Sequence, residues 1–158
     1  MKVAVLGCGA AGFFSAISCK AYHPDNDVTI YEKSGKLLSK VKVSGGGRCN
    51  VANACFGISQ LAKNYPRGEK QLKKAFSVFS TADTVKWFES RGVKLKAESD
   101  NRMFPVTDDS QTIVDCLMCE VEKLGIKIKT NCFIQSIRKT ESGFILNTDD
   151  EKKSLLIK

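Results

Sequence analysis

A glycine loop near the N-terminus constrains the fold of this chain more than any other feature. Residues 7–12 read GCGAAG and match the pattern GxGxxG. The apolar residues 2–6 before the loop are typical of a buried strand, and residues 10–22 after it carry apolar side chains at helical spacing. A second strand pattern follows at residues 28–32. This order predicts a β–α–β unit, the smallest piece of a parallel sheet with a crossover helix.

The positions in this loop suit a pyrophosphate. Gly7 permits a tight turn, and Gly9 lets the backbone approach a ligand closely. Gly12 lets the helix sit close to the sheet. Ala10 and Ala11 open the helix, whose N-terminus offers free N–H groups and a partial positive charge to phosphates. The loop therefore predicts a dinucleotide site.

The acidic residue Glu32 strengthens this interpretation. It ends the second predicted strand, about 20 residues after Gly12, where such a carboxylate accepts hydrogen bonds from the ribose hydroxyls. A carboxylate there repels a 2′-phosphate, so NADP is disfavoured at this site. Lys33 beside it belongs to the same candidate site. The alternative is a glycine turn in an unrelated α/β protein with a chance Glu32, and these elements alone do not separate FAD from NAD.

A second glycine loop distinguishes between the two cofactors. Residues 44–53 read SGGGRCNVAN, where an NAD-dependent dehydrogenase would usually continue quickly into another crossover helix. The loop offers flexible backbone donors, a cation at Arg48 and amides at Asn50 and Asn53. That set suits a second contact with an extended pyrophosphate or with a ring edge, which favours FAD. The alternative is a mobile surface loop with a chance arginine.

The second loop also carries a family resemblance. Residues 42–53, KVSGGGRCNVAN, closely resemble the SGGGRCN-V-T-N signature of the BaiN-type NAD(P)/FAD-dependent oxidoreductases, also called aminoacetone-oxidase-like FAD-binding enzymes. YPRG at 65–68, WF at 87–88 and RMFPVTD at 102–108 agree in the same order, so the resemblance covers nearly the whole chain. Ala52 stands where threonine is common, which removes one hydroxyl contact. The resemblance implies a flavin-dependent oxidoreductase, with NAD(P)H as a possible electron donor.

The resemblance also implies which residues form the cofactor site. The first loop would cradle the pyrophosphate of FAD, Glu32 would hold the ribose, and the second loop would line the flavin side. Phe133, after the last predicted helix, would offer backbone groups to the adenine. No catalytic residue is assigned, because the isoalloxazine itself transfers the electrons. The candidate cofactor-binding residues are Gly7, Gly9, Ala10, Ala11, Gly12, Glu32, Lys33, Gly46, Gly47, Arg48, Cys49, Asn50, Asn53 and Phe133.

The remaining patterns complete the expected fold. The class is α/β: a Rossmann-like FAD-binding domain with a parallel sheet, crossover helices and an antiparallel β-meander. Residues 33–68 are expected to be rich in loops, and residues 2–6, 28–32 and 126–129 to be adjacent parallel strands. Helices are predicted at 70–79, 82–91 and 113–124, short strands at 93–96 and 103–106, and the meander at 133–137, 144–146 and 155–157.

The length of the chain gives a further expectation. Members of the resembled family are much longer than 158 residues and continue through an ATGG-like turn, a substrate-side insert domain and a C-terminal segment that covers the flavin. Residues 1–158 are therefore interpreted as the N-terminal part of an FAD/NAD(P)-binding domain, truncated before those parts. We expect weak FAD binding, no sustained turnover and association through an open sheet edge. A non-catalytic dinucleotide-binding remnant is the alternative.

The cysteines indicate no metal site. Seven cysteines form an odd set, and Cys116 and Cys119 make a CxxC inside a predicted helix, on one face. No second CxxC or nearby histidine completes a zinc site, so both are expected to pack in the core, with redox or metal binding as the alternative. Cys49 beside Arg48 is either a reactive thiol or a packing residue, and packing is favoured.

The charge balance limits the expected partners. The net charge is +8, with a local excess of five cations against one acid at Lys63, Arg67, Glu69, Lys70, Lys73 and Lys74. A solvated helical face is favoured over nucleic-acid binding, because no aromatic or Arg/Gly-rich pattern accompanies these residues. The expected partner is a small molecule of unknown identity, and a nucleic-acid-associated flavoprotein is an alternative. No signal-peptide or membrane-spanning pattern is found, so a cytoplasmic protein without membrane contact is expected. The oligomeric state stays open.

Overall fold

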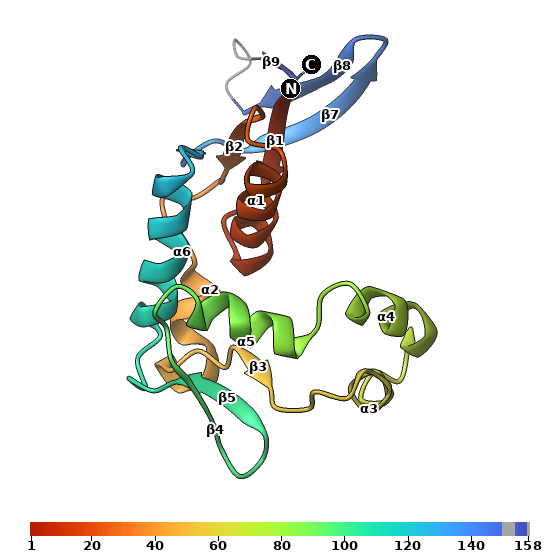
Figure 1. Ribbon diagram of the computed structural model, residues 1–158. Helices are drawn as coiled ribbons and strands as arrows, with labels where there is room; N and C mark the ends of the chain where they lie inside the picture. The colour runs from red at the N-terminus through yellow and green to blue at the C-terminus, as the bar shows by residue number, and fades with distance from the viewer. Residues whose placement is uncertain (150–153, 158) are drawn as a thin grey trace. The chain divides into compact units, whose positions relative to one another are not determined.

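The computed structural model of the chain describes residues 1–149 and 154–157 (Figure 1). The chain forms two compact units. Unit 1 consists of Met1–Val41 and Leu117–Lys158, and unit 2 consists of Lys42–Cys116. Each unit is described by itself.

A three-stranded parallel sheet forms the centre of unit 1. β1 (Lys2–Leu6) pairs with β2 (Asp27–Tyr31), and β2 pairs with β6 (Lys127–Lys129). The helix α1 (Ala10–Tyr22) connects the first two strands. The three strands expected from the sequence are thus confirmed as adjacent and parallel, with β2 in the middle.

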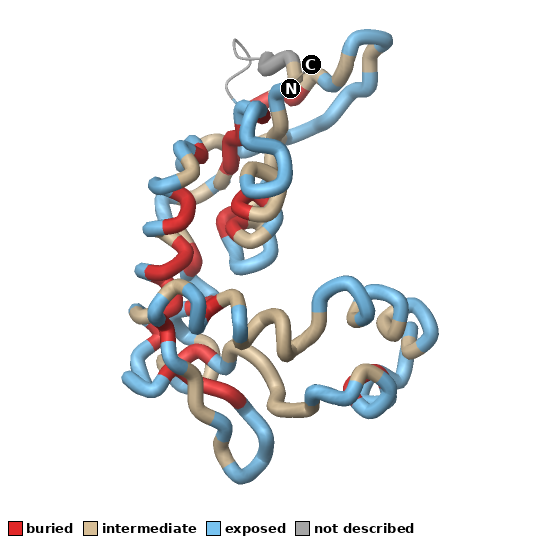
Figure 2. Tube along the Cα trace, in the orientation of Figure 1, coloured by how far each residue is buried: buried red, intermediate tan, exposed pale blue. Residues whose placement is uncertain are grey.

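The core of unit 1 lies between α1 and this sheet. α1 buries Phe13, Ala16 and Ile17, whose spacing of three and four residues puts them on one helical face. The middle strand contributes Val28 and Ile30, which are also fully buried. Figure 2 shows these buried segments in α1 and β2. Burial of this apolar stripe fixes the helix against the strands, and the glycine loop lies between them.

An antiparallel meander completes the described part of unit 1. β7 (Ile134–Thr140), β8 (Gly143–Thr148) and β9 (Ser154–Ile157) pair in the order β7-β8-β9. Gly143 has φ +146° where the chain turns into β8, a conformation that glycine adopts without strain. The meander expected from the alternating pattern is confirmed.

A small antiparallel sheet lies in unit 2. β5 (Arg102–Pro105) pairs with β3 (Ala52–Asn53) on one side and β4 (Leu95–Ala97) on the other. Phe104 in the middle strand is fully buried and Met103 nearly so. The predicted β4–β5 hairpin is confirmed, with strand bounds shifted by one or two residues.

The helices of unit 2 are partly as predicted. α4 (Glu69–Phe76) and α5 (Thr81–Glu89) are confirmed, and Ser80 and Asp83 form a capping box at the start of α5. α6 (Gln111–Lys123), whose residues are divided between the two units, is also confirmed, and Gly125 follows it with φ +64°. None of the described helices is long and apolar enough to span a membrane.

The expectation of a loop-rich segment at residues 33–68 is wrong in part. It contains α2 (Ser39–Val43), the 3-10 helix η1 (Ser44–Gly47), α3 (Ile58–Lys63) and the two-residue strand β3. These elements are four to six residues long, or two in the case of β3, which is too short for a helical or strand period to emerge from the sequence.

Candidate functional site

The first glycine loop joins the carboxyl end of β1 to the start of α1. Gly7 has φ +101°, and its N–H donates to Tyr31 O at 2.8 Å, which ties the loop to β2. Gly9 is the N-cap of α1, and no side chain caps the helix there. A Cβ added to Gly7 or Gly9 would meet nothing within 4 Å. The backbone therefore leaves open space at the N-terminus of a 13-residue helix, which is the environment that a phosphate group needs.

Gly12 determines how closely the helix approaches the strand. A Cβ on Gly12 would lie 1.9 Å from Gly7 O and 3.6 Å from Val5 Cγ1. Only hydrogen fits in that space, so α1 packs directly onto the backbone of the loop. This contact is the physical reason for the third glycine of the motif.

Glu32 is directed at the glycine loop. Its Oε2 accepts a hydrogen bond from Cys8 N at 2.9 Å, and its Oε1 accepts from Ser34 N at 2.9 Å and Ser34 Oγ at 3.0 Å. Among the described residues it forms no ion pair with a lysine. The backbone N–H groups of Cys8 and Ser34 lower the pKa of Glu32, with a smaller effect from the Lys33 charge, so the carboxylate is ionised at neutral pH.

A pocket of about 200 Å³ opens beside this carboxylate. Gly7, Glu32 and Lys33 line one part of it, and Cys132 and Phe133 line another. The Cys132 N–H donates to Glu32 O at 2.9 Å, which fixes the second segment beside the first. The structure thus brings together candidate residues about 100 positions apart in sequence.

Several residues of this pocket were not predicted. Leu6, Tyr31, Cys132 and Ile134 also line it. Each is the sequence neighbour of a candidate residue, and that adjacency is the only signal that could have found them. Burial raises the pKa of the nearby Cys8 thiol to about 11, with a further contribution from the Glu32 charge, so Cys8 is a packing residue and not a thiolate.

The second glycine loop, in unit 2, has a left-handed backbone. Gly45, Gly46 and Gly47 have φ values of +57°, +69° and +87°, and Cys49 has φ +61°. Gly45 is enclosed, because a Cβ there would lie 2.7 Å from Phe104 Cε1. A Cβ on Gly46 or Gly47 would meet nothing within 4 Å.

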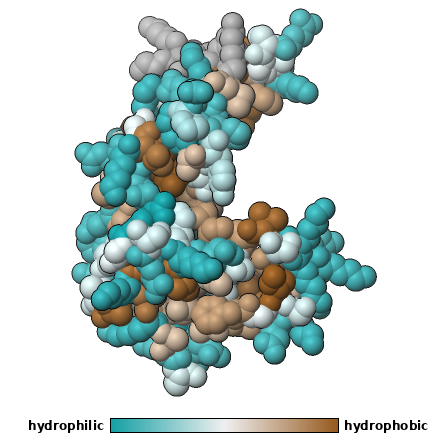
Figure 3. Space-filling model, viewed as in Figure 1, coloured by the Kyte–Doolittle hydropathy of each residue, from teal (hydrophilic) through white to brown (hydrophobic). Residues whose placement is uncertain are grey.

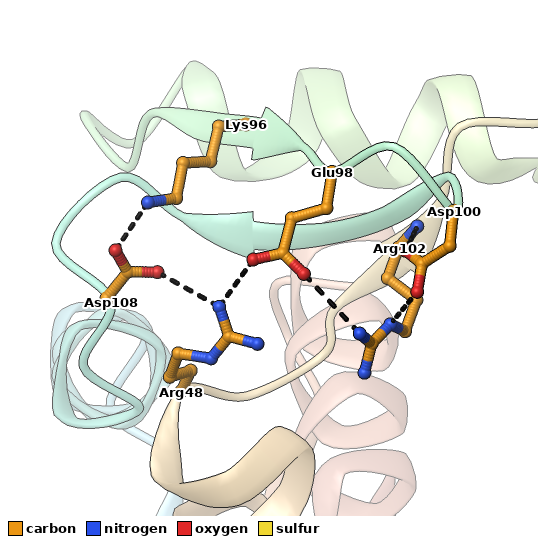
Figure 4. Close-up of polar contacts among 6 residues, drawn as sticks. All are labelled: Arg48, Lys96, Glu98, Asp100, Arg102 and Asp108. Carbon is orange, nitrogen blue, oxygen red and sulfur yellow. Dashed lines mark hydrogen bonds and ion pairs between the residues drawn. The ribbon is translucent and has the colours of Figure 1, made fainter.

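The polar side chains of this loop are engaged within unit 2. Arg48 pairs with carboxylates of the β4–β5 region (Figure 4), so the expectation of a cation offered to a ligand does not describe this conformation. Asn53 Oδ1 accepts from Cys55 N at 3.0 Å. With its amide oriented to suit its surroundings, Asn50 donates to Ala52 O at 3.0 Å. The open part of the loop is its backbone at Gly46 and Gly47.

Cys49 is buried, and this burial raises the pKa of its thiol. A raised pKa keeps the thiol protonated at neutral pH, which supports the packing role over the reactive one. The candidate residues thus fall into two groups, each placed within its own unit. Gly7–Gly12, Glu32, Lys33 and Phe133 belong to unit 1, and Gly46–Asn53 belong to unit 2.

The sequence matches a known protein family over nearly its whole length. The model of the HI0933-like protein Rossmann domain matches residues 1–157. The chain belongs to the HI0933-like family. The match confirms the resemblance drawn from the SGGGRCN loop, and with it the expectation of an FAD-binding Rossmann domain.

Two curated relatives cover most of this HI0933-like chain. It is 24% identical over 151 residues to the 3-dehydro-bile acid delta(4,6)-reductase of Clostridium scindens, covering 96% of this chain and 36% of the relative. It is 29% identical over 143 residues to the ribosomal RNA dihydrouridine synthase of Escherichia coli, covering 90% of this chain and 34% of the relative. The chain therefore spans about a third of the length of these relatives.

Solved structures agree on the fold. The 3-ketosteroid-delta4-(5alpha)-dehydrogenase from Rhodococcus jostii superposes with a TM-score of 0.70 at 13% identity, covering 96% of this chain and 42% of that one. The fumarate reductase subunit FrdA of E. coli gives 0.65 at 12% identity, covering 94% and 29%. With the family match, these likenesses confirm the Rossmann-like fold class with a parallel sheet and antiparallel strands.

The CxxC in α6 is not a pair of core thiols. Cys116 is buried, but Cys119 is exposed, so the expectation that both pack in the core is wrong for Cys119. Only part of the helical face that carries Cys116 and Cys119 is buried. Within residues 1–149 and 154–157, no three His, Cys, Asp or Glu side chains gather as a metal site would require.

The basic residues expected on a helical face lie on α3, α4 and the turn between them. Lys73 pairs with Glu69 at 2.7 Å, whereas Lys63, Arg67, Lys70 and Lys74 are exposed and form no ion pair within the described part of the chain. Exposed aromatic side chains accompany them at Phe56 and Tyr65, which are 53% and 44% exposed. Figure 3 shows hydrophobic and hydrophilic side chains side by side over this α3–α4 region. The segment 56–74 therefore carries exposed aromatic side chains as well as cations.

Gly12→Ala should destabilise unit 1, because its Cβ cannot fit beside Gly7 O. We expect a loss of about 2 kcal/mol or more in the free energy of unfolding, as for overpacked positions. Gly9→Ala is the matched control: its φ of −82° suits any residue and its Cβ meets nothing. The control should stay within about 1 kcal/mol of wild type, the usual size of an N-cap change. Urea unfolding followed by circular dichroism measures both, and equal losses would contradict the assigned contact.

Proposed function

We propose that this chain holds the adenosine and pyrophosphate of FAD in unit 1, and that the whole protein uses the flavin to reduce a carbon–carbon double bond next to a carbonyl. One observation carries the cofactor part of the proposal. The ionised carboxylate of Glu32 is fixed by the Cys8 and Ser34 N–H groups at the edge of a pocket that also contains Gly7 and Phe133.

The residues of unit 1 fit the adenosine half of FAD. The open backbone at Gly7 and Gly9 leaves room for the pyrophosphate at the N-terminus of α1, where the helix dipole favours negative charge. Glu32 would accept hydrogen bonds from the ribose hydroxyls. Phe133, 45% exposed at the pocket wall, would lie against the adenine.

The charge on Glu32 distinguishes cofactors that carry a ribose 2′-phosphate from cofactors that do not. Because Glu32 carries a negative charge at neutral pH, a 2′-phosphate on the ribose would be repelled, as Coulomb's law requires at short range. FAD has no such phosphate. NAD(P)H is proposed as the electron donor, and an NADPH donor would have to bind outside this pocket.

The names of the two relatives support the proposed reaction class. One is named for reducing the delta(4,6) system of a 3-dehydro-bile acid, and the other for forming dihydrouridine in ribosomal RNA. Both names denote the saturation of a carbon–carbon double bond. Such a step adds a hydride and a proton to the substrate and oxidises the reduced flavin by two electrons. When bound, FAD supplies this electron transfer, and the residues of this chain bind and orient it.

The ribose assignment gives the sharpest prediction for the cofactor. Glu32→Ala should weaken FAD binding by roughly 1–3 kcal/mol, the usual effect of losing hydrogen bonds to a charged group. Asp27→Ala is the control, since this carboxylate lies at the opposite end of β2 and pairs with Lys127 at 2.8 Å. A fluorescence titration of FAD with wild type and both variants measures the ratio of dissociation constants. If Glu32→Ala leaves the affinity unchanged, the ribose role must be abandoned.

A base in RNA is a second candidate substrate. Exposed cations lie on α3, α4 and the turn between them, and the exposed aromatic residues Phe56 and Tyr65 lie before α3 and in that turn. Positive charge with stacking surfaces is the usual basis of single-strand binding. One relative is named for acting on ribosomal RNA. A small-molecule substrate stays the first candidate.

A charge-reversal experiment separates the two substrate classes. If RNA is the substrate, Lys70→Glu/Lys74→Glu should weaken binding of a labelled single-stranded RNA by roughly tenfold or more, and should flatten its salt dependence. The control is Arg138→Glu/Lys139→Glu on β7, which makes the same charge change in unit 1. Fluorescence anisotropy at several salt concentrations measures both. Equal losses, or no RNA binding by wild type, would leave the small-molecule candidate.

A further inference from the structure

Arg48 of the second glycine loop pairs with two carboxylates of unit 2 that lie 50 and 60 residues further along the sequence. Its Nη1 lies 2.5 Å from Glu98 Oε1 and 3.5 Å from Asp108 Oδ1. Figure 4 shows the guanidinium turned toward these two side chains. Glu98 follows β4, and Asp108 follows β5. Arg48 is therefore attached to the two ends of the β4–β5 hairpin.

These contacts belong to a balanced network of three acids and three bases. Glu98 uses its other oxygen, Oε2, to contact Arg102 Nη2 at 3.5 Å, and Arg102 Nε pairs with Asp100 at 2.6 Å. Asp108 also pairs with Lys96. The hydrogen bond that Arg48 donates to the Glu98 carboxylate raises the pKa of Arg48, so the guanidinium stays charged while its charge is compensated inside the protein.

The flat face of the Arg48 guanidinium makes a further contact, with an aromatic ring. The Arg48 guanidinium carbon lies 4.0 Å from the centroid of the Phe104 ring, a cation–π distance. Phe104 is fully buried, and its Cε1 is the atom that a Cβ on Gly45 would meet at 2.7 Å. The contacts thus run from Glu98 through Arg48 and Phe104 to Gly45, the first left-handed residue of the loop.

The backbone of the loop is held independently at its other side. Ser110 is buried, its N–H donates to Gly47 O at 2.9 Å, and its Oγ donates to Lys42 O at 2.9 Å. Gly46 thus lies between Gly45, which contacts Phe104, and Gly47, whose carbonyl accepts the Ser110 hydrogen bond. A Cβ on Gly46 or Gly47 would meet nothing within 4 Å. The open space beside Gly46 and Gly47 lets a ligand approach the backbone of the loop closely.

We infer that Glu98 is a positioning residue of the cofactor site, which fixes Arg48 on the Phe104 ring and so keeps Gly46 and Gly47 in the conformation that leaves their backbone open to the ligand. The inference rests on the proposed FAD-binding function, with the second loop on the flavin side of the cofactor as the resemblance implies. In this arrangement Arg48 supports the loop. The groups that face the cofactor are then uncharged backbone atoms and not a free cation. A planar guanidinium is required, because it pairs along its edge while stacking on its face, which an ammonium cannot do.

The expected effect is local. Arg48 and Glu98 are both 31% exposed, and ion pairs with that access to water contribute about 1 kcal/mol or less to global stability. Removing the pair should loosen the loop without unfolding unit 2. This separates a positioning role from a general structural one.

Hydrogen exchange of the whole 158-residue chain, without any ligand, tests the positioning role. In Glu98→Gln, the amides of residues 44–50 should exchange roughly fivefold faster, the factor equivalent to about 1 kcal/mol. Arg48→Lys should do the same, because lysine keeps the charge and loses the planar contacts. Glu98→Gln/Arg48→Lys should be no faster than the faster single variant, since the residues act as a unit. Asp100→Asn, in the same turn and paired with Arg102 and not with Arg48 in the described part of the chain, is the matched control and should change little.

FAD titration of the same variants tests the cofactor part separately. Glu98→Gln should weaken FAD binding by a similar factor and alter the absorbance of bound flavin, with the midpoint of thermal unfolding unchanged. Unchanged loop exchange in Glu98→Gln, or equal acceleration in Asp100→Asn, overturns the positioning role. Faster loop exchange with unchanged FAD affinity overturns the link between the loop and the cofactor. A failure of the proposed function itself would be seen elsewhere, as an absent effect of Glu32→Ala.

Discussion

The close contact between Gly12 and the carbonyl of Gly7 is the constraint on which unit 1 depends. A Cβ at position 12 would lie only 1.9 Å from Gly7 O, so α1 can approach β1 this closely only with glycine at that position. That approach places Phe13, Ala16 and Ile17 in the core and brings the N-terminus of α1 to the carboxyl end of the strand. The close packing of α1 and the open space at Gly7 and Gly9 therefore occur in the same six-residue loop.

Glu32 connects this packing to function. In the structure its carboxylate is held by the backbone of the glycine loop and by Ser34, which keeps it charged and oriented before any ligand arrives. A preoriented acceptor loses little conformational entropy when a ribose binds. The second loop shows the same principle in a different way, because ion pairing and stacking at Arg48 hold a left-handed glycine backbone in place.

Much of the parallel sheet could be predicted from the sequence because its signals are local. The glycine spacing, the apolar stripe of α1 and the position of Glu32 each occupy a short stretch with a fixed period. Short elements such as α2, α3 and β3 were missed because a few residues show no period. The same limit applies to Cys119, whose exposure depends on what covers α6 and not on its own helix.

The site was predictable where neighbours in sequence are also neighbours in space. Arg48 was recognised, but its partners Glu98 and Asp108 lie 50 and 60 residues further along, and no pattern in the sequence links an arginine to one carboxylate among many. The role of Arg48 therefore changed from an offered cation to a compensated one. Phe133 was placed by resemblance, while Cys132 beside it came from the geometry of the pocket.

The central claim is that Glu32 and the glycine loop form a site for an adenosine ribose without a 2′-phosphate. Calorimetric titration of the chain with ADP-ribose and with its 2′-phosphorylated analogue tests this most directly, because these ligands contain the adenosine and pyrophosphate without the flavin. The account predicts that the 2′-phosphate weakens binding by roughly tenfold or more, about 1.4 kcal/mol, and that Glu32→Gln removes most of this difference. Equal binding of the two ligands by wild type would contradict it.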